Sequence, residues 1–283
     1  MKQSRILAVT FSFLLLATAL VGCAEPPAPT PAPTPTKPEI VTFPDSNLEA
    51  AIRDALGKPP DEEILSTELA QLTRLRIQDR GVVDLTGLEY CINLTLLELR
   101  DEPITDISPL SSLTNLTDLH LCGNEISDIS PLASLTKLTF LAIAVNPVSD
   151  LSPLSALTNL TCLDLADDEI SDLSPLASLT NLTILCLQGN EVSDISPLSS
   201  LTNLTDLRLT QNQVSNISQL VENSGLGAGD TILLGGNNLD LTEGSEDMEN
   251  IRALEARGVD VSLDPHQWAP EHVLPGAPVP IPE

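Results

Sequence analysis

The most constraining feature of this 283-residue sequence is a repeat of 22 residues that begins near residue 75. Leucine returns at one position of each unit, and leucine or isoleucine returns two residues later. The first set is Leu97, Leu119, Leu141, Leu163, Leu185 and Leu207, and the second is Leu99, Leu121, Ile143, Leu165, Leu187 and Leu209. A period of roughly 20–50 residues is the signature of a solenoid, in which each unit buries its apolar side against its neighbours.

The two halves of each unit predict different local structures. Two leucines separated by one residue predict a short strand, because residues two apart in a strand point to the same side. On the return half, Ser-Pro followed by Leu-x-x-Leu predicts a one-turn 3-10 segment with Ser as N-cap and Pro as the first helical residue. Ordering one coil costs about as much free energy as its burial supplies, so the coils must stack to be stable.

A polar residue recurs three positions after each strand, where the chain must turn. An inward asparagine amide at that position can bond backbone groups of its own and the neighbouring coil. The predicted turn ladder comprises Asn124, Asn146, Asp168, Asn190, Asn212 and Asn237. Asp168 can still accept backbone hydrogen bonds, so its coil is expected to hold. Arg80 and Glu102 occupy the position in the first two coils, where we expect looser turns.

The pattern LxxLxLxxNxI, which begins at Leu116, is the leucine-rich repeat signature. The second half of the unit, ISDISPL followed by LTNL, resembles the 22-residue class of bacterial internalins. The resemblance covers residues 64–240 and implies an α/β fold. That fold is a right-handed leucine-rich repeat solenoid with a curved parallel β ribbon, 3-10 or short helices on the convex side, and a helical N-terminal cap. It also implies recognition or adhesion at a cell surface, although neither an immunoglobulin-like segment nor an LPxTG anchor follows the repeats.

Both ends of a solenoid need a cover for the exposed core. Residues 39–63 are predicted to form the N-terminal cap, since Leu48, Ile52 and Leu56 recur at helical spacing before Gly57. Residues 241–264 are predicted to form the C-terminal cap, with a helix over 243–257 and a strand over 259–263. Residues 265–283 contain six prolines in 19 residues and predict a disordered tail.

The N-terminal segment predicts export and anchoring. Residues 1–22 have a basic start followed by an apolar run. A membrane span needs about 20 apolar residues and this run is shorter, so the segment is typical of a signal peptide rather than of a retained transmembrane helix. Leu-Val-Gly before Cys23 resembles the lipobox of bacterial lipoproteins, which implies cleavage and diacylation of Cys23. Residues 23–38 then form a proline-rich spacer, interpreted as a stalk rather than an SH3-type ligand. We therefore expect a membrane-anchored lipoprotein of the cell envelope that faces outward.

Composition and motifs argue against several function classes. The 40 acidic and 13 basic residues give a formal net charge of −27, which disfavours nucleic-acid binding. HExxH, CxxC, GxxxxGK[ST] and GxSxG are absent, so no metal or cofactor is expected. His120 lies near Glu98 and Asp118, an arrangement that could perform acid–base chemistry. With no nucleophile and no lid, we interpret it as a surface ion pair and predict no enzyme activity.

The residues that alternate with the inward leucines form the concave face, which we define as three outward columns. In the coil of Leu141, these columns hold Phe140, Ala142 and Ala144. An apolar centre with charged edges is typical of a protein interface. The predicted partner-binding residues are Phe140, Ala142, Ala144, Cys162, Asp164, Ile184, Cys186 and Arg208. The alternative is a structural envelope scaffold without a specific ligand, in which the small residues merely tolerate curvature.

The cysteines other than Cys23 are expected to remain free thiols. Cys162 and Cys186 lie on a diagonal between neighbouring strands, which separates Cβ atoms by about 7–8 Å, too far for a disulfide. The ligand of the concave face, a protein or another cell-surface molecule, is not named by any feature of the sequence.

Overall fold

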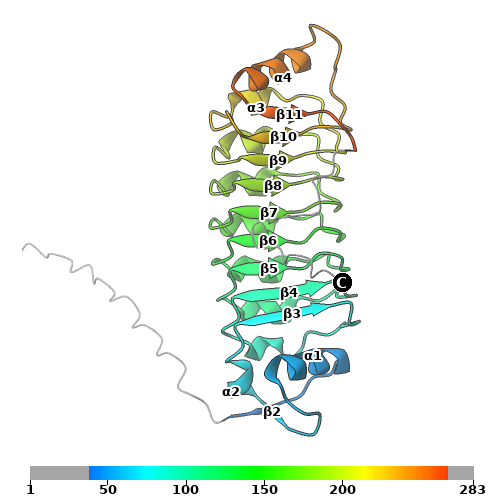
Figure 1. The fold of residues 1–283 in the computed structure, drawn as a ribbon, viewed down its shortest axis with the longest axis vertical. Helices are drawn as coiled ribbons and strands as arrows, with labels where there is room; N and C mark the ends of the chain where they lie inside the picture. The colour runs from blue at the N-terminus through cyan, green and yellow to red at the C-terminus, as the bar shows by residue number, and fades with distance from the viewer. Residues whose placement is uncertain (1–37, 267–283) are drawn as a thin grey trace, which may run out of the picture. The chain divides into compact units, whose positions relative to one another are not determined.

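The computed structural model describes residues 38–266, and nine of its strands form one parallel sheet (Figure 1). The strands lie in the order β11-β10-β9-β8-β7-β6-β5-β4-β3. Their bounds are β3 Arg74–Gln78, β4 Leu96–Arg100, β5 Asp118–His120, β6 Phe140–Ala142, β7 Cys162–Asp164, β8 Ile184–Cys186, β9 Asp206–Arg208, β10 Thr231–Leu233 and β11 Asp260–Ser262. The predictions for the signal peptide, Cys23, the spacer to residue 37 and the segment 267–283 lie outside the described residues.

The other side of each coil carries the expected 3-10 segments. These are η1 Leu88–Tyr90, η2 Ser108–Ser112, η3 Ser130–Ser134, η4 Ser152–Ala156, η5 Ser174–Ser178 and η6 Ser196–Ser200, followed by a short helix, α3 Ser218–Glu222. The predicted N-cap role of serine is wrong, because Ser108 is the first helical residue and Pro109 the second. The N-cap is Ile107, which has no side-chain cap bond, and Asp106 Oδ1 accepts the backbone N–H of Ser108 at 2.8 Å instead. A side chain two residues before the segment reaches that N–H without the N-cap geometry.

The inward leucines build one continuous core between the sheet and the 3-10 segments. Leu119, Leu141 and Leu163 are paired in register across β5, β6 and β7 and are fully buried. Each such side chain contributes about 1.5–3 kcal/mol of burial free energy. Since each coil contacts only its neighbours, this free energy depends on the stack remaining intact.

The N-terminal cap is the helix α1 Ser46–Leu56, which covers the core at the first coil (Figure 1). Asp45 Oδ1 accepts the backbone N–H groups at the start of α1, and Oδ2 accepts the N–H of Val83 at 2.7 Å. Asp45 therefore caps the helix and fastens it to the first coil. A two-stranded antiparallel sheet, β1 Ile40–Val41 with β2 Ile64–Leu65, and the short helix α2 Ser66–Leu69 complete this end.

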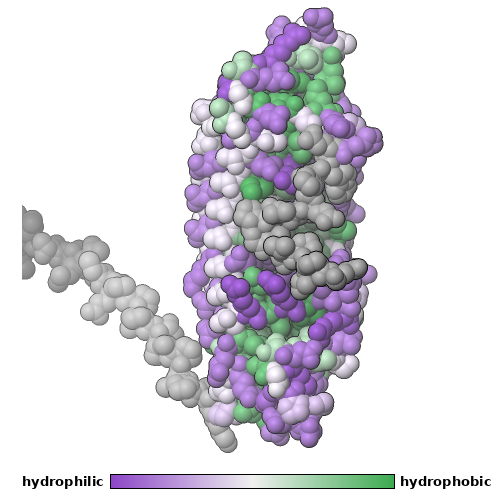
Figure 2. All heavy atoms as spheres, in the orientation of Figure 1, coloured by the Kyte–Doolittle hydropathy of each residue, from purple (hydrophilic) through white to green (hydrophobic). Residues whose placement is uncertain are grey.

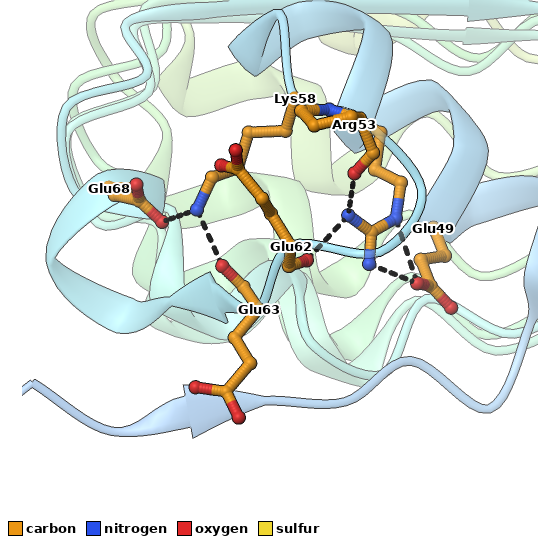
Figure 3. Close-up of polar contacts among 7 residues, drawn as sticks. Glu49, Arg53, Lys58, Glu62, Glu63 and Glu68 are labelled. Carbon is orange, nitrogen blue, oxygen red and sulfur yellow. Dashed lines mark hydrogen bonds and ion pairs between the residues drawn. The ribbon is translucent and has the colours of Figure 1, made fainter.

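Two basic side chains hold the loop between α1 and β2 (Figure 3). The Arg53 guanidinium donates to Glu49 Oε1 at 2.7 and 2.9 Å and to the carbonyl of Glu62 at 2.8 Å. Lys58 Nζ donates to Glu68 Oε2 at 2.6 Å. These contacts satisfy loop carbonyls that no strand partner reaches.

The C-terminal end has the predicted helix and strand with shorter bounds. The helix α4 Glu246–Ala256 begins three residues later than predicted, because Ser245 Oγ accepts the N–H of Met248 and supplies the N-cap. The strand β11 then adds to the sheet beside β10 in parallel. The last described residues, 263–266, follow β11 directly.

The turn ladder joins every coil to the one before it. Asn190 is typical: its Nδ2 donates to the carbonyls of Leu165 at 2.7 Å and Leu187 at 3.0 Å, and its Oδ1 accepts the N–H of Ile170 at 3.0 Å. The residue before each ladder position has a positive φ. Glycine occupies this place at Gly123, Gly189 and Gly236, but Val145 adopts it with φ 61°. A β-branched residue is rarely found in this conformation.

The expectation of a loose turn at Glu102 is wrong. Its side chain is buried, with Oε1 accepting the N–H of Arg80 at 2.9 Å and Oε2 accepting the N–H of Val82 at 2.7 Å. The longer glutamate side chain reaches two backbone N–H donors of the preceding turn, whereas an inward asparagine would reach only one. Arg80 instead turns outward and pairs with Asp54 of α1 at 2.7 Å.

Candidate binding site on the concave face

The strand register brings the predicted partner-binding residues together. In the first outward column Phe140 pairs with Cys162, and Cys162 pairs with Ile184. In the second column Ala142, Asp164, Cys186 and Arg208 are in register, and Ala144 begins the third beside them. Four of these side chains form a hydrophobic cluster separate from the main core, with Cys122 and Ile184 packed against it. We call this the concave cluster: Phe140, Ala142, Cys162 and Cys186.

The concave cluster is more buried than a side chain on an open ribbon would be. Phe140 retains 5% of its exposed area and Cys186 retains 1%, although both lie on the face opposite the leucines. A carboxylate introduced by Phe140→Asp would therefore be buried without a partner, and that substitution is expected to cost stability. In the orientation of Figure 2, hydrophobic patches alternate with hydrophilic side chains along the stack.

Two side chains border the concave cluster: the ring of His120 on β5 and the guanidinium of Arg100 on β4. The rings of His120 and Phe140 lie 4.5 Å apart between centroids. Arg100 Nη2 lies 2.8 Å from His120 Nδ1, and since a guanidinium only donates, Nδ1 accepts. Burial and then the Arg100 charge lower the pKa of His120 to about 4. His120 is consequently neutral at physiological pH, and the interpretation as a surface ion pair with Glu98 or Asp118 is wrong.

Charged pairs lie at both edges of this site. Glu98, which is 5% exposed, lies 3.2 Å from Arg76 Nε and 3.0 Å from Arg100 Nε. At the other edge the Arg208 guanidinium donates to Asp206 at 3.0 and 2.7 Å. Arg76, Arg100 and Glu98 are not among the predicted site residues. The signal that could have found them is their place in the outward columns, two strands before Phe140 for Glu98 and Arg100 and three strands before it for Arg76.

The cysteines of the site are unsuited to nucleophilic chemistry. All four cysteines of the described part of the chain, Cys91, Cys122, Cys162 and Cys186, are free thiols. Burial, followed by the neighbouring Asp164 charge, raises the pKa of Cys162 to about 12. The thiolate, which is the reactive form, is therefore scarce at neutral pH. In this arrangement the thiols act as small apolar side chains.

Asp168 sits in the turn ladder at the edge of the concave face. Its Oδ1 accepts the N–H of Asn146 at 2.8 Å, and its buried Oδ2 has no hydrogen-bond partner. Burial raises the pKa of Asp168 to about 8, against the lowering effect of the Asn146 N–H. The carboxyl is therefore largely protonated at neutral pH, unlike an ordinary aspartate.

Two further structural findings bear on function. Within residues 38–266, no group of three or more His, Cys, Asp or Glu side chains is placed to hold a metal ion. In that same part of the chain, no helix is both long and apolar enough to cross a membrane.

Comparisons with known proteins agree with this architecture. The pattern "Leucine Rich repeats (2 copies)" matches residues 92–134, 114–156, 136–178 and 180–222. The crystal structure of internalin C2 from Listeria monocytogenes str. 4b F2365 is 33% identical with a TM-score of 0.71, and the match covers 82% of this chain and all of that one. No curated protein matches the chain.

Two more distant structures share the fold alone. A leucine-rich repeat protein of Leptospira interrogans is 23% identical with a TM-score of 0.59, over 69% of this chain and 50% of that one. The leucine-rich repeat ectodomain of the plant membrane receptor kinase GASSHO1/SCHENGEN3 from Arabidopsis thaliana, in complex with CASPARIAN STRIP INTEGRITY FACTOR 2, is 23% identical with a TM-score of 0.52, over 64% of this chain and 22% of that one.

The nine parallel strands, the 3-10 segments on the opposite side and the N-terminal helix define a leucine-rich repeat domain. The chain belongs to the leucine-rich repeat family, and its structural relatives include the internalins. Domains of this family are generally non-catalytic binding modules, and they typically bind proteins.

Proposed function

We propose that the chain is a lipid-anchored recognition module of the cell surface, which binds a protein or another surface ligand through its concave face. The observation that carries this proposal is the concave cluster, which is separate from the main core. The side chains of the concave cluster lie on the face opposite the leucines and contribute nothing to the leucine core. That they group together there favours a role in contact with another surface.

The arrangement around the concave cluster suits an interface. The cluster supplies an apolar centre, and the Glu98 and Arg208 pairs supply charged edges on both sides. Phe140 is the aromatic side chain of this centre, and aromatic side chains are frequent anchors of binding free energy. Loss of such an anchor costs about 2 kcal/mol or more, roughly a thirtyfold change in affinity.

The binding proposal is tested by comparing three proteins in the capture of partners from surface extracts. The wild-type chain and Leu241→Ala, a control at an exposed leucine that belongs to none of the concave columns, are expected to retain the same partner. Phe140→Ala removes the ring without burying a charge and is expected to retain at least about thirtyfold less. Equal retention by all three proteins, or no retained partner, would favour the scaffold function.

The lipid anchor is a separate part of the proposal. Its support is the resemblance of Leu-Val-Gly-Cys23 to a lipobox and the proline-rich spacer that follows. In an extended polyproline II conformation the spacer would hold the domain roughly 45 Å from the bilayer. Metabolic labelling with a fatty acid is expected to mark the wild-type chain but not Cys23→Ser, which should be released from membranes. A Cys23→Ser protein that stays membrane-bound to the same extent would refute the anchor.

A further inference from the structure

The first two strands of the concave face, β3 and β4, carry an excess of arginine. Their six outward positions hold three arginines and one glutamate, a net charge of +2, whereas the whole chain has a formal net charge of −27. These positions are Arg74, Arg76 and Gln78 on β3 and Leu96, Glu98 and Arg100 on β4. The local charge is therefore opposite in sign to that of the chain that carries it.

The Glu98 carboxylate holds two of these guanidinium groups close together. Its Oε2 lies 3.2 Å from Arg76 Nε, and its Oε1 lies 3.0 Å from Arg100 Nε. Arg100 is fixed a second time, because its Nη2 donates to His120 Nδ1 at 2.8 Å. One negative charge thus positions two cations that would otherwise repel each other, and it cannot neutralise both.

The donors of the three arginines are not satisfied by the described part of the chain. Within residues 38–266 the Arg74 side chain has no hydrogen bond or ion pair, and the Arg76 side chain has only its contact with Glu98. Although Arg100 Nε is close to Glu98, its N–H forms no hydrogen bond. Arg208 differs, since its Nε and Nη2 both donate to Asp206. Arg74 is exposed and the Arg76 side chain is 52% exposed, so a ligand can reach their free donors.

The free donors define the chemistry of a ligand. A guanidinium presents five N–H donors in a planar fork that matches a carboxylate or a phosphate. A long polyanion would bring many more charges than these arginines can neutralise, and the remaining acidic surface of the chain would repel it. A short segment with two or three carboxylates brings a charge that matches the local excess of arginine. Charge complementarity therefore favours acidic side chains over a polyphosphate.

We propose that Arg74, Arg76 and Arg100 bind the carboxylates of a short acidic segment of a protein partner. Neutral His120 adds a donor at Nε2, because its Nδ1 accepts from Arg100. The inference deepens the proposed function and rests on it for the partner. Since β4 lies two strands from β6, or about 9–10 Å, an extended segment with an acidic residue about three positions from an apolar one spans the distance from Arg100 to the concave cluster. The binding of carboxylates itself is tested without a partner.

The test is fluorescence anisotropy of the full chain with three fluorescein-labelled probes, which are tetraglutamate, tetraglycine and octathymidylate. The variant is Arg74→Gln/Arg76→Gln. The matched control is Lys137→Gln/Arg252→Gln, which changes the net charge equally at two exposed residues outside the concave columns. Arg74→Gln alone removes a side chain that has no contact within residues 38–266 to lose, so unfolding cannot explain its effect. Thermal melting of each protein checks the fold.

We expect tetraglutamate to bind the wild-type chain and the Lys137→Gln/Arg252→Gln chain equally. Binding to Arg74→Gln/Arg76→Gln should be at least about tenfold weaker, the effect of losing one hydrogen bond between charged groups, and Arg74→Gln alone should show a smaller loss. Tetraglycine should not bind. Absent binding of tetraglutamate, or an equal loss in the control, would overturn the inference. Octathymidylate that binds as tightly as tetraglutamate would assign the arginines to phosphates and overturn it as well.

Capture from surface extracts separates this inference from the proposed function. A partner that the wild-type chain retains should be retained at least about tenfold less by Arg74→Gln/Arg76→Gln. Equal retention by both proteins would overturn the inference and leave the proposed function standing. A missing partner together with binding of tetraglutamate would refute only the proposed function.

Discussion

Asp168→Asn is expected to stabilise the protein, and by an amount that grows with pH. Asp168 is the one ladder residue between β6 and β10 that is not asparagine, and burial raises its pKa to about 8. An unfolded aspartate has a pKa near 3.9. Between these values the folded chain binds a proton that the unfolded chain releases, so the free energy of unfolding falls as pH rises.

The magnitude follows from the separation of the two pKa values. Each pH unit between about 4 and 8 removes about 1.4 kcal/mol, so the wild-type chain loses about 4 kcal/mol through this group from pH 4 to pH 7. The amide introduced by Asp168→Asn cannot ionise, and it can donate to strand carbonyls as Asn146 and Asn190 do. The variant therefore escapes this loss and regains a hydrogen bond at the unpaired Oδ2 position.

Urea unfolding of both proteins at pH 5, 6, 7 and 8 measures the effect. The stability gain of Asp168→Asn should increase by about 1.4 kcal/mol per pH unit and level off above pH 8. Asp172→Asn is the matched control, because the N–H and hydroxyl of Ser174 lower the pKa of that exposed carboxyl. Its contribution is lost only as pH falls through the acidic range, so its effect should be constant from pH 5 to 8. A gain from Asp168→Asn that is equally constant would refute the burial argument.

Two further predictions concern the coils. Leu165→Asp places an unpaired charge in the core between β7 and its 3-10 segment and should cost at least about 4 kcal/mol of stability. The assay is the thermal melting temperature, which should fall sharply. Unchanged melting would contradict the strand register. Val145→Asn should stabilise the chain by about 0.5–1 kcal/mol in denaturant unfolding, because asparagine adopts the positive φ of that turn more readily than valine. A destabilised variant would show that Val145 is not strained.

The fold could be predicted from the sequence because the information is local and repeated. One inward pair such as Leu163 and Leu165 defines a strand, and the fixed spacing aligns it with the next coil. The same register places Phe140 beside Cys162 without any knowledge of the structure. Repetition turns a weak local signal into a definite arrangement in space.

The parts that could not be predicted depend on side-chain length and rotamer, which a column of residues does not reveal. The sequence suggests that Glu102 cannot replace asparagine, yet its longer side chain reaches two backbone donors. The sequence also places His120 with nearby carboxylates, but its partner is Arg100 on the diagonal of the neighbouring strand. The positive φ of Val145 leaves no signal in the sequence, because glycine, the usual indicator, is absent there.

The most direct test of the central claim asks which face of the domain touches the partner. A photo-reactive benzoyl-phenylalanine replaces Phe140 on the concave face in one protein and Tyr90, in η1 on the opposite side, in a second. After irradiation in surface extracts, we predict a cross-linked partner from position 140 and none from position 90. Cross-linking from position 90 alone, or from neither position, would contradict recognition through the concave face.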